Sequence, residues 1–167
     1  MKALDLNQMN RNAPYHLDKA ARPNYYHFIS KVGAEFVIGF DEDDFISSES
    51  YQFIIVKAND VPLPMDKGVR DTVFVVIQEF FRANNSVMLY ICDTGDGKQA
   101  MRNRLFHYWI SSFLDKGKFT VLQSSVKDGE GIDNYYAIIT RNDNPHAKEA
   151  INEFLETTYL FSQKPKE

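Results

Sequence analysis

The chain has 167 residues, 44% of them hydrophobic and 25% charged, which is the composition of an ordinary globular protein and argues against a disordered body. Its formal net charge of −4 lacks the positive excess of nucleic-acid-binding and membrane-surface proteins, so neither kind of partner is expected. The single cysteine, Cys92, excludes an intramolecular disulfide, and no apolar run has the length of a signal peptide or a transmembrane helix, so we expect a soluble, cytoplasmic protein.

Both ends of the chain are polar. Residues 1–24 have weak periodicity, which predicts an irregular or partly helical arm, loosely attached or used in an oligomer contact. Residues 162–167 form a short charged tail. No repeat, low-complexity segment or linker divides the chain between them, so residues 25–161 are expected to form one domain.

The first half of that domain predicts three strands and a helix. Alternating apolar residues predict strands at 25–30 and 34–40, which form a hairpin, and a third strand at 51–57. The acidic run Asp41–Asp44 is interpreted as a solvated turn that ends the second strand. Apolar residues then recur at helical spacing over 68–83, with Asp66 before them as the N-cap.

The second half predicts three more strands and two helices. Residues 87–92 are apolar on both faces, so this strand should lie in the middle of a sheet. Strands at 119–125 and 134–141 should form a second hairpin. The helices are expected at 98–114 and after Asn144, which would cap a helix whose first residue is proline.

Periodicity also predicts which sides of these two helices are buried. In the helix over 98–114, apolar residues recur every four positions, and they are Met101, Leu105, Trp109 and Phe113, with Phe106 and Ile110 beside them. In the last helix the buried stripe is expected to consist of Ala147, Ala150, Ile151, Phe154 and Leu155.

The element order is therefore β-β-β-α-β-α-β-β-α. Hairpins at both ends favour antiparallel pairing, while the connecting helices permit one or two parallel pairs. The predicted fold class is α+β, a mostly antiparallel sheet of about six strands with three helices that cover one face.

A polar loop, Asp93–Gly97, follows the central strand, where α/β proteins often place chemistry. Asp93 and Asp96 are candidates to hold a metal ion or a proton, and His107 is a third candidate catalytic residue. Their spacing departs from the phosphatase and calcium-loop signatures. We therefore favour a turn in which Asp96 caps the following helix.

Basic residues gather on the first turns of that helix. Lys98, Arg102 and Arg104 are candidates to bind an anion at a helix N-terminus, together with His107. The alternative, which we favour, is a solvated helix face whose charges pair with the nearby aspartates.

The other chemistry-bearing residues favour structural roles. No two histidines have metal-ligand spacing, so the sequence predicts neither a metal nor a cofactor. Cys92 ends an apolar strand and is interpreted as a small buried hydrophobe rather than a nucleophile. The many aromatic residues of the first three strands are best interpreted as core.

Part of the chain resembles an uncharacterised bacterial domain family of unknown function. The residues that carry the resemblance are Tyr90-Ile91-Cys92-Asp93, Arg102, Leu105-Phe106, Trp109, Tyr135-Tyr136 and Asn144-Pro145. The resemblance covers most of Tyr25 to Phe161 and implies a soluble bacterial domain. It carries no known activity, so no catalytic residue is transferred from it.

Three functions remain open at this point. A non-enzymatic module that binds a protein partner or self-associates is favoured, because the chain has ordinary charge, many aromatic residues and no recognised catalytic signature. The alternative is an enzyme or a small-ligand, metal or anion binder centred on the Asp93–Gly97 loop and the start of the next helix. Nucleic-acid binding through Arg102 and Arg104 is the weakest hypothesis.

Overall fold

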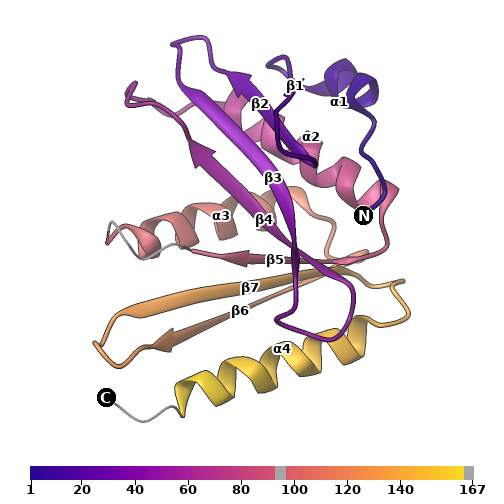
Figure 1. Cartoon of the computed structure of the whole chain (residues 1–167), viewed down its shortest axis with the longest axis vertical. Coiled ribbons are helices and arrows are strands. Elements are labelled where there is room, and N and C mark those ends of the chain that lie inside the picture. Colours follow the sequence, from indigo (N-terminus) through magenta and orange to yellow (C-terminus); the bar gives the residue numbers. More distant parts are fainter. Residues whose placement is uncertain (93–96, 164–167) are drawn as a thin grey trace. The chain divides into compact units, whose positions relative to one another are not determined.

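Figure 1 shows the computed structural model of the chain, which describes residues 1–92 and 97–163. Within these residues the helices are α1 (Leu6–Asn12), α2 (Lys67–Ala83), α3 (Gln99–Phe113) and α4 (Ala147–Ser162). The strands are β1 (Asp18–Lys19), β2 (Tyr25–Ile29), β3 (Glu35–Asp43), β4 (Ser50–Lys57), β5 (Val87–Ile91), β6 (Phe119–Lys127) and β7 (Asp133–Arg141).

The strands of the described chain form a mixed sheet in the order β1-β2-β3-β4-β5-β7-β6. Strands β4 and β5 pair in parallel, and α2 connects them. The pairs β1–β2, β2–β3, β5–β7 and β6–β7 are antiparallel. The predicted α+β class is confirmed, with seven strands and four helices in the described residues rather than about six and three.

The additional elements, α1 and β1, both lie in residues 1–24, where the sequence predicted an irregular or partly helical arm. Leu4, Met9 and Leu17 of this segment are buried. A helix of 7 residues and a strand of 2 residues are too short to leave a clear period in the sequence. Contacts with the rest of the chain, rather than local propensity, therefore hold them.

Contacts divide the chain into two compact units, Met1–Asp41 with Phe53–Asn85 and Glu42–Gln52 with Ser86–Glu167. In the first unit, the aromatic core joins the strands to α2. The ring of Phe40 on β3 stacks on Phe80 of α2 at 4.5 Å between centroids and contacts Phe53 of β4 at 5.6 Å. Helix α2 begins where the sequence predicted it, because the Asp66 side chain accepts the N–H groups of Gly68 and Val69.

In the second unit, β5 lies between β4 and β7, as its apolar sequence predicted. Its two faces are covered by different helices (Figure 1). Leu89 packs in a cluster with Phe154 of α4, whereas the ring of Tyr90 stacks on Phe106 of α3 at 3.8 Å. The expectation that the helices cover one face is therefore wrong for this unit. A strand that is apolar on both faces needs a cover on each.

Two predicted boundaries also need correction. Strand β3 continues to Asp43, so the acidic run does not end it, and Asp41 forms an ion pair with Arg22 at 2.9 Å. Helix α4 has His146 rather than Asn144 at its N-cap position. The Asn144 side chain accepts the N–H of His146 at 2.9 Å, which forms a turn before the helix and delays its start.

Candidate functional site

The loop that the sequence predicted as a site begins directly after β5. Asp93 and Asp96 lie outside the described residues, so their proposed roles as ligands, proton carriers or helix cap stay predictions. Beyond the loop, α3 begins after Lys98, whose side chain makes no capping hydrogen bond. Within residues 1–92 and 97–163, no group of three or more His, Cys, Asp and Glu side chains is arranged to hold a metal ion.

Cys92, at the edge of this loop, lies in a buried setting. Its side chain hydrogen-bonds to that of Tyr90, whose ring stacks on Phe106. Burial raises the pKa of the Cys92 thiol, and the hydrogen bond with Tyr90 and the charge of Arg102 offset this effect only in part. The thiol therefore stays protonated at neutral pH, which is the property of a structural rather than a nucleophilic cysteine.

The basic candidates lie on different sides of α3. Arg102 is half-buried, and its charge acts on Cys92. Lys98, Arg104 and His107 are exposed. Because successive residues of an α-helix are rotated by about 100°, Arg104 lies about 160° around the helix from Arg102. The structure brings Arg102 towards the buried Cys92 and leaves the other three candidates facing solvent.

The outer side of α3 carries large apolar side chains. Met101, Leu105 and Tyr108 are 54%, 47% and 66% exposed and follow one another at helical spacing. Of the apolar residues that the sequence singled out on this helix, Phe106 and Ile110 are buried, Trp109 and Phe113 are half-buried, and Met101 and Leu105 are exposed, so the expectation holds only in part. Apolar residues occur on both sides of this helix, and periodicity alone could not choose between them.

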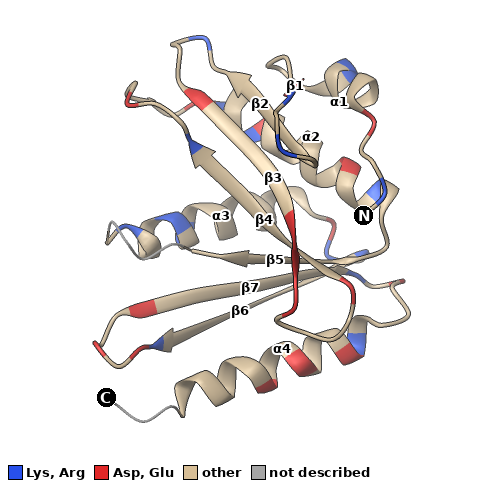
Figure 2. Ribbon diagram, in the orientation of Figure 1, with Lys and Arg blue, Asp and Glu red and all other residues tan. Residues whose placement is uncertain are grey.

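The formally charged side chains of α3 and of the residue before it are all basic. Lys98, Arg102 and Arg104 occur between residues 98 and 113, and no acidic residue does. Figure 2 shows the basic residues near the start of α3. We call Met101, Leu105 and Tyr108, together with the exposed Arg104, the α3 surface.

Helix α4 has an outer surface of the opposite charge. Leu155, Tyr159 and Leu160 are 46%, 64% and 64% exposed, so the prediction that Leu155 is buried is wrong. The helix carries one basic residue, Lys148, and three glutamates, which are spread along it in Figure 2 and are Glu149, Glu153 and Glu156. We call Leu155, Tyr159 and Leu160, with the exposed Glu149 and Glu156, the α4 surface.

Two of the three glutamates have partners in their own unit: Glu149 lies 3.8 Å from the ring of His146, and Glu153 contacts Ser47. The Glu153 carboxylate accepts the N–H of Ser47 at 2.6 Å and also the Ser47 hydroxyl. These hydrogen bonds lower the pKa of Glu153. Glu153 therefore anchors the loop between β3 and β4, and the α4 surface is defined without it.

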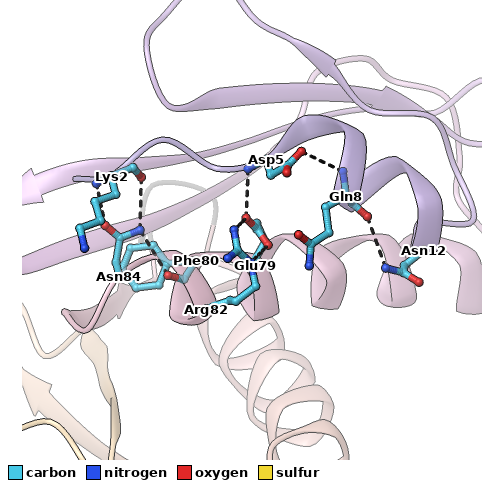
Figure 3. Close-up of polar contacts among 8 residues, drawn as sticks. All are labelled: Lys2, Asp5, Gln8, Asn12, Glu79, Phe80, Arg82 and Asn84. Carbon is cyan, nitrogen blue, oxygen red and sulfur yellow. Dashed lines mark hydrogen bonds and ion pairs between the residues drawn. The ribbon is translucent and has the colours of Figure 1, made fainter.

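A polar pocket of about 180 Å³ lies between α1 and α2 in the first unit. Figure 3 shows the contacts beside it, where the buried Glu79 carboxylate accepts the N–H of Asp5 and the guanidinium N–H groups of Arg82. Small-molecule sites commonly measure about 300–1,000 Å³. Because the pocket is smaller and its carboxylate is already paired, we interpret it as part of the packing that holds α1.

Comparison with protein families assigns no activity to the chain. A model described as a family of unknown function (DUF6169) matches residues 65–156. The match includes the whole of α2, β5, α3, β6 and β7 and the first ten residues of α4. No curated protein matches the chain. In the described residues, no helix is both long enough and apolar enough to span a membrane.

Proposed function

Because the chain belongs to the DUF6169 family, whose function is unknown, we propose its function from its exposed surfaces: it is a non-enzymatic module that binds a protein through the α3 surface. The observation that carries this proposal is the exposure of Met101, Leu105 and Tyr108 on one side of a helix. The expectation of a cytoplasmic bacterial protein is part of the same proposal.

The spacing of these three residues supports the proposal. They occupy positions i, i+4 and i+7, which is the anchor spacing that helices use when they dock on a partner. Burying a large apolar side chain contributes up to about 1.5–3 kcal/mol, so even partial burial of three neighbours is a useful source of affinity. Single exposed apolar residues are common on protein surfaces, but a continuous stripe of them favours binding.

Photo-crosslinking in the native host tests the proposal. A photoreactive phenylalanine analogue at Tyr108, the last and most exposed apolar residue of the α3 surface, should trap a protein in a discrete adduct. Leu105→Lys places a charge beside the probe and should remove that adduct, because an apolar contact does not tolerate an unpaired ammonium group.

The matched control carries the probe at Gln78, an exposed residue of α2. It should give no discrete adduct. Equal adducts at both positions, or an adduct at Tyr108 that Leu105→Lys leaves unchanged, would contradict binding through the α3 surface. Thermal unfolding of each variant checks that the fold is intact, which we expect since both side chains are exposed.

A further inference from the structure

We propose that the outer edge of β6 is a second interaction surface, on which the β6 strand of another copy of this chain pairs antiparallel about a two-fold axis. This inference goes beyond the proposed function, because it uses no residue of the α3 surface. The surface consists of the outward-facing backbone groups of Val121, Gln123 and Ser125, and we call it the β6 edge.

The β6 edge carries backbone groups without partners. Strand β6 is the last in the sheet order and pairs with β7. The Lys118 carbonyl accepts the N–H of Asn142 at 2.8 Å, so even-numbered residues of the ladder face β7 and odd-numbered ones face away. Within residues 1–92 and 97–163, the outward N–H and C=O groups of Val121, Gln123 and Ser125 make no hydrogen bond. The ligand that complements such groups is another extended backbone.

Strand β6 lacks the features that usually protect a sheet edge from pairing, which are shortness, bulges, proline and charged side chains. Its 9 residues pair one to one with β7, so it has no bulge, and it contains no proline. Its one charged residue, Lys127, is the last of the strand and forms an ion pair with Asp133 at 3.0 Å. By contrast β1, at the other end of the strand order, has 2 residues.

The charges at the two ends of β6 indicate which strand pairs with it. Lys116 and Lys118 precede β6 and Glu130 follows it, and all three are exposed and form no ion pair in the described part of the chain. Antiparallel pairing with Gln123 opposite Gln123 brings the lysines of each copy towards Glu130 of the other. Parallel pairing would place lysines beside lysines. Charge therefore favours an antiparallel second copy, in which two-fold symmetry repeats the same contact at both ends.

Helix α4 runs along β6 and β7 (Figure 1), and one of its flanks faces the centre of the sheet. Glu153 on that flank binds Ser47 in the loop between β3 and β4. Ile46 of the same loop packs in a cluster with Val87 and Leu89 of β5. The Glu153 flank of α4 therefore faces β5, and the opposite flank faces the β6 edge.

The flank of α4 beside the β6 edge is apolar. Because each residue of an α-helix is rotated by about 100°, Leu155 lies about 160° from Glu153, and Tyr159 follows one turn later. These two side chains are 46% and 64% exposed. A second copy paired through β6 brings its own α4 alongside, so Leu155 and Tyr159 meet their counterparts. The exposed apolar flank and the unpaired strand edge thus select the same partner independently.

This pairing produces a closed assembly. The contact uses the same surface on both copies, so it ends at a dimer with no β6 edge left over. Helix α3 packs on the other face of β5, through Phe106 and Tyr90, so the α3 surface stays available. Self-association through β6 is therefore compatible with the proposed function and independent of it.

Sedimentation velocity of the purified full chain tests the pairing with a matched pair of variants. Wild type should show a concentration-dependent monomer–dimer equilibrium. Gln123→Pro removes an outward N–H that β7 does not use, so the chain should fold, as thermal unfolding would check, and stay monomeric. Gln123→Ala keeps the N–H and should dimerise like wild type.

Two side chains of α4 give a second matched pair. Leu155→Lys should weaken dimerisation by about tenfold or more in the dissociation constant, because two-fold symmetry brings the new charges together. Leu160→Lys should have no effect, since Leu160 is 64% exposed but lies on the Glu153 flank. Neither change should unfold the chain, because both side chains are exposed.

Disulfide formation tests the register. Opposed residues in a hydrogen-bonded antiparallel pair have Cα atoms about 5.5 Å apart, which a disulfide can span. Gln123→Cys should therefore form a covalent dimer under mild oxidation. Ser125→Cys is the control, because the two-fold axis keeps the two copies of residue 125 several residues apart along the strands.

Several results would overturn the inference. They are a wild-type chain that is monomeric at all concentrations, a folded Gln123→Pro variant that still dimerises, equal effects of Leu155→Lys and Leu160→Lys, and no disulfide at Gln123→Cys. Failure of the proposed function looks different. Loss of the Tyr108 adduct in the host leaves β6 pairing intact, and a dimer that depends on Leu105 instead of Gln123 excludes β6 pairing while binding through the α3 surface stands.

Discussion

The buried carboxylate of Glu79 on α2 accepts the backbone N–H of Asp5 at 3.0 Å, and so ties the N-terminal segment to a helix more than 70 residues later in the sequence. Arg82 donates to the same carboxylate at 2.7 Å. Directly after α2, Asn84 exchanges two hydrogen bonds with the backbone of Lys2. These contacts, shown in Figure 3, explain why α1 is packed although it is too short to be stable alone.

Removing the Glu79 side chain should therefore loosen the N-terminal segment. Glu79→Ala leaves the N–H of Asp5 without its acceptor, and we expect a loss of about 1–3 kcal/mol in the free energy of unfolding, measured by urea titration. Glu79→Gln keeps an acceptor oxygen and should cost less. Gln78→Ala, at the exposed neighbouring position, should be close to neutral. Equal losses for all three variants would contradict the role of this carboxylate.

The same carboxyl group should make stability depend on pH. Hydrogen bonding from Arg82 is the main reason that the pKa of Glu79 lies below its ordinary value of 4.5. A carboxyl group whose pKa is lower in the folded state adds stability that is fully present above the unfolded pKa and is lost as the pH falls through the folded pKa. The difference in unfolding free energy between wild type and Glu79→Gln should thus be constant well above pH 4.5 and shrink below it. A difference that is the same at every pH would show that the charge of Glu79 does not contribute.

The contact between β2 and β3 predicts a position that tolerates only glycine. Gly39 pairs with Tyr25, and a Cβ atom at Gly39 would lie 2.4 Å from the tyrosine ring. Gly39→Ala should force the ring to move and destabilise the protein by about 1–3 kcal/mol in thermal or urea unfolding. In the background of Tyr25→Ala the same change should cost much less. Additive losses would mean that the ring does not restrict this position.

The register of α3 can be tested by comparing its two sides. Phe106 is buried against Tyr90, so Phe106→Ala should cost about 3–5 kcal/mol in the free energy of unfolding. Met101 is 54% exposed, and Met101→Ala should change it by less than about 0.5 kcal/mol. A larger loss for Met101→Ala than for Phe106→Ala would mean that Met101, rather than Phe106, lies on the buried side of α3.

The sequence correctly predicted the elements whose pattern is compatible with only one structure. Residues 87–92 are apolar on both faces, and the strand lies between two others because no exposed position would suit it. Asp66 precedes a helix with one apolar side, so its capping role and the buried side of α2 followed from spacing alone. The α+β class followed from the order of these elements.

Where a sequence pattern is compatible with two arrangements, only the tertiary structure shows which one forms. Helix α3 has apolar residues on more than one side, and the contact of Phe106 with Tyr90 shows which side is buried. The α3 and α4 surfaces therefore could not be found from periodicity, which placed Leu105 and Leu155 in the core. The parallel pairing of β4 with β5 and the packing of α1 depend on partners distant in sequence. The local sequence determines whether a segment prefers helix or strand. Which side of that helix or strand is buried depends on the contacts of the whole folded chain, because several sides can satisfy the local pattern equally well.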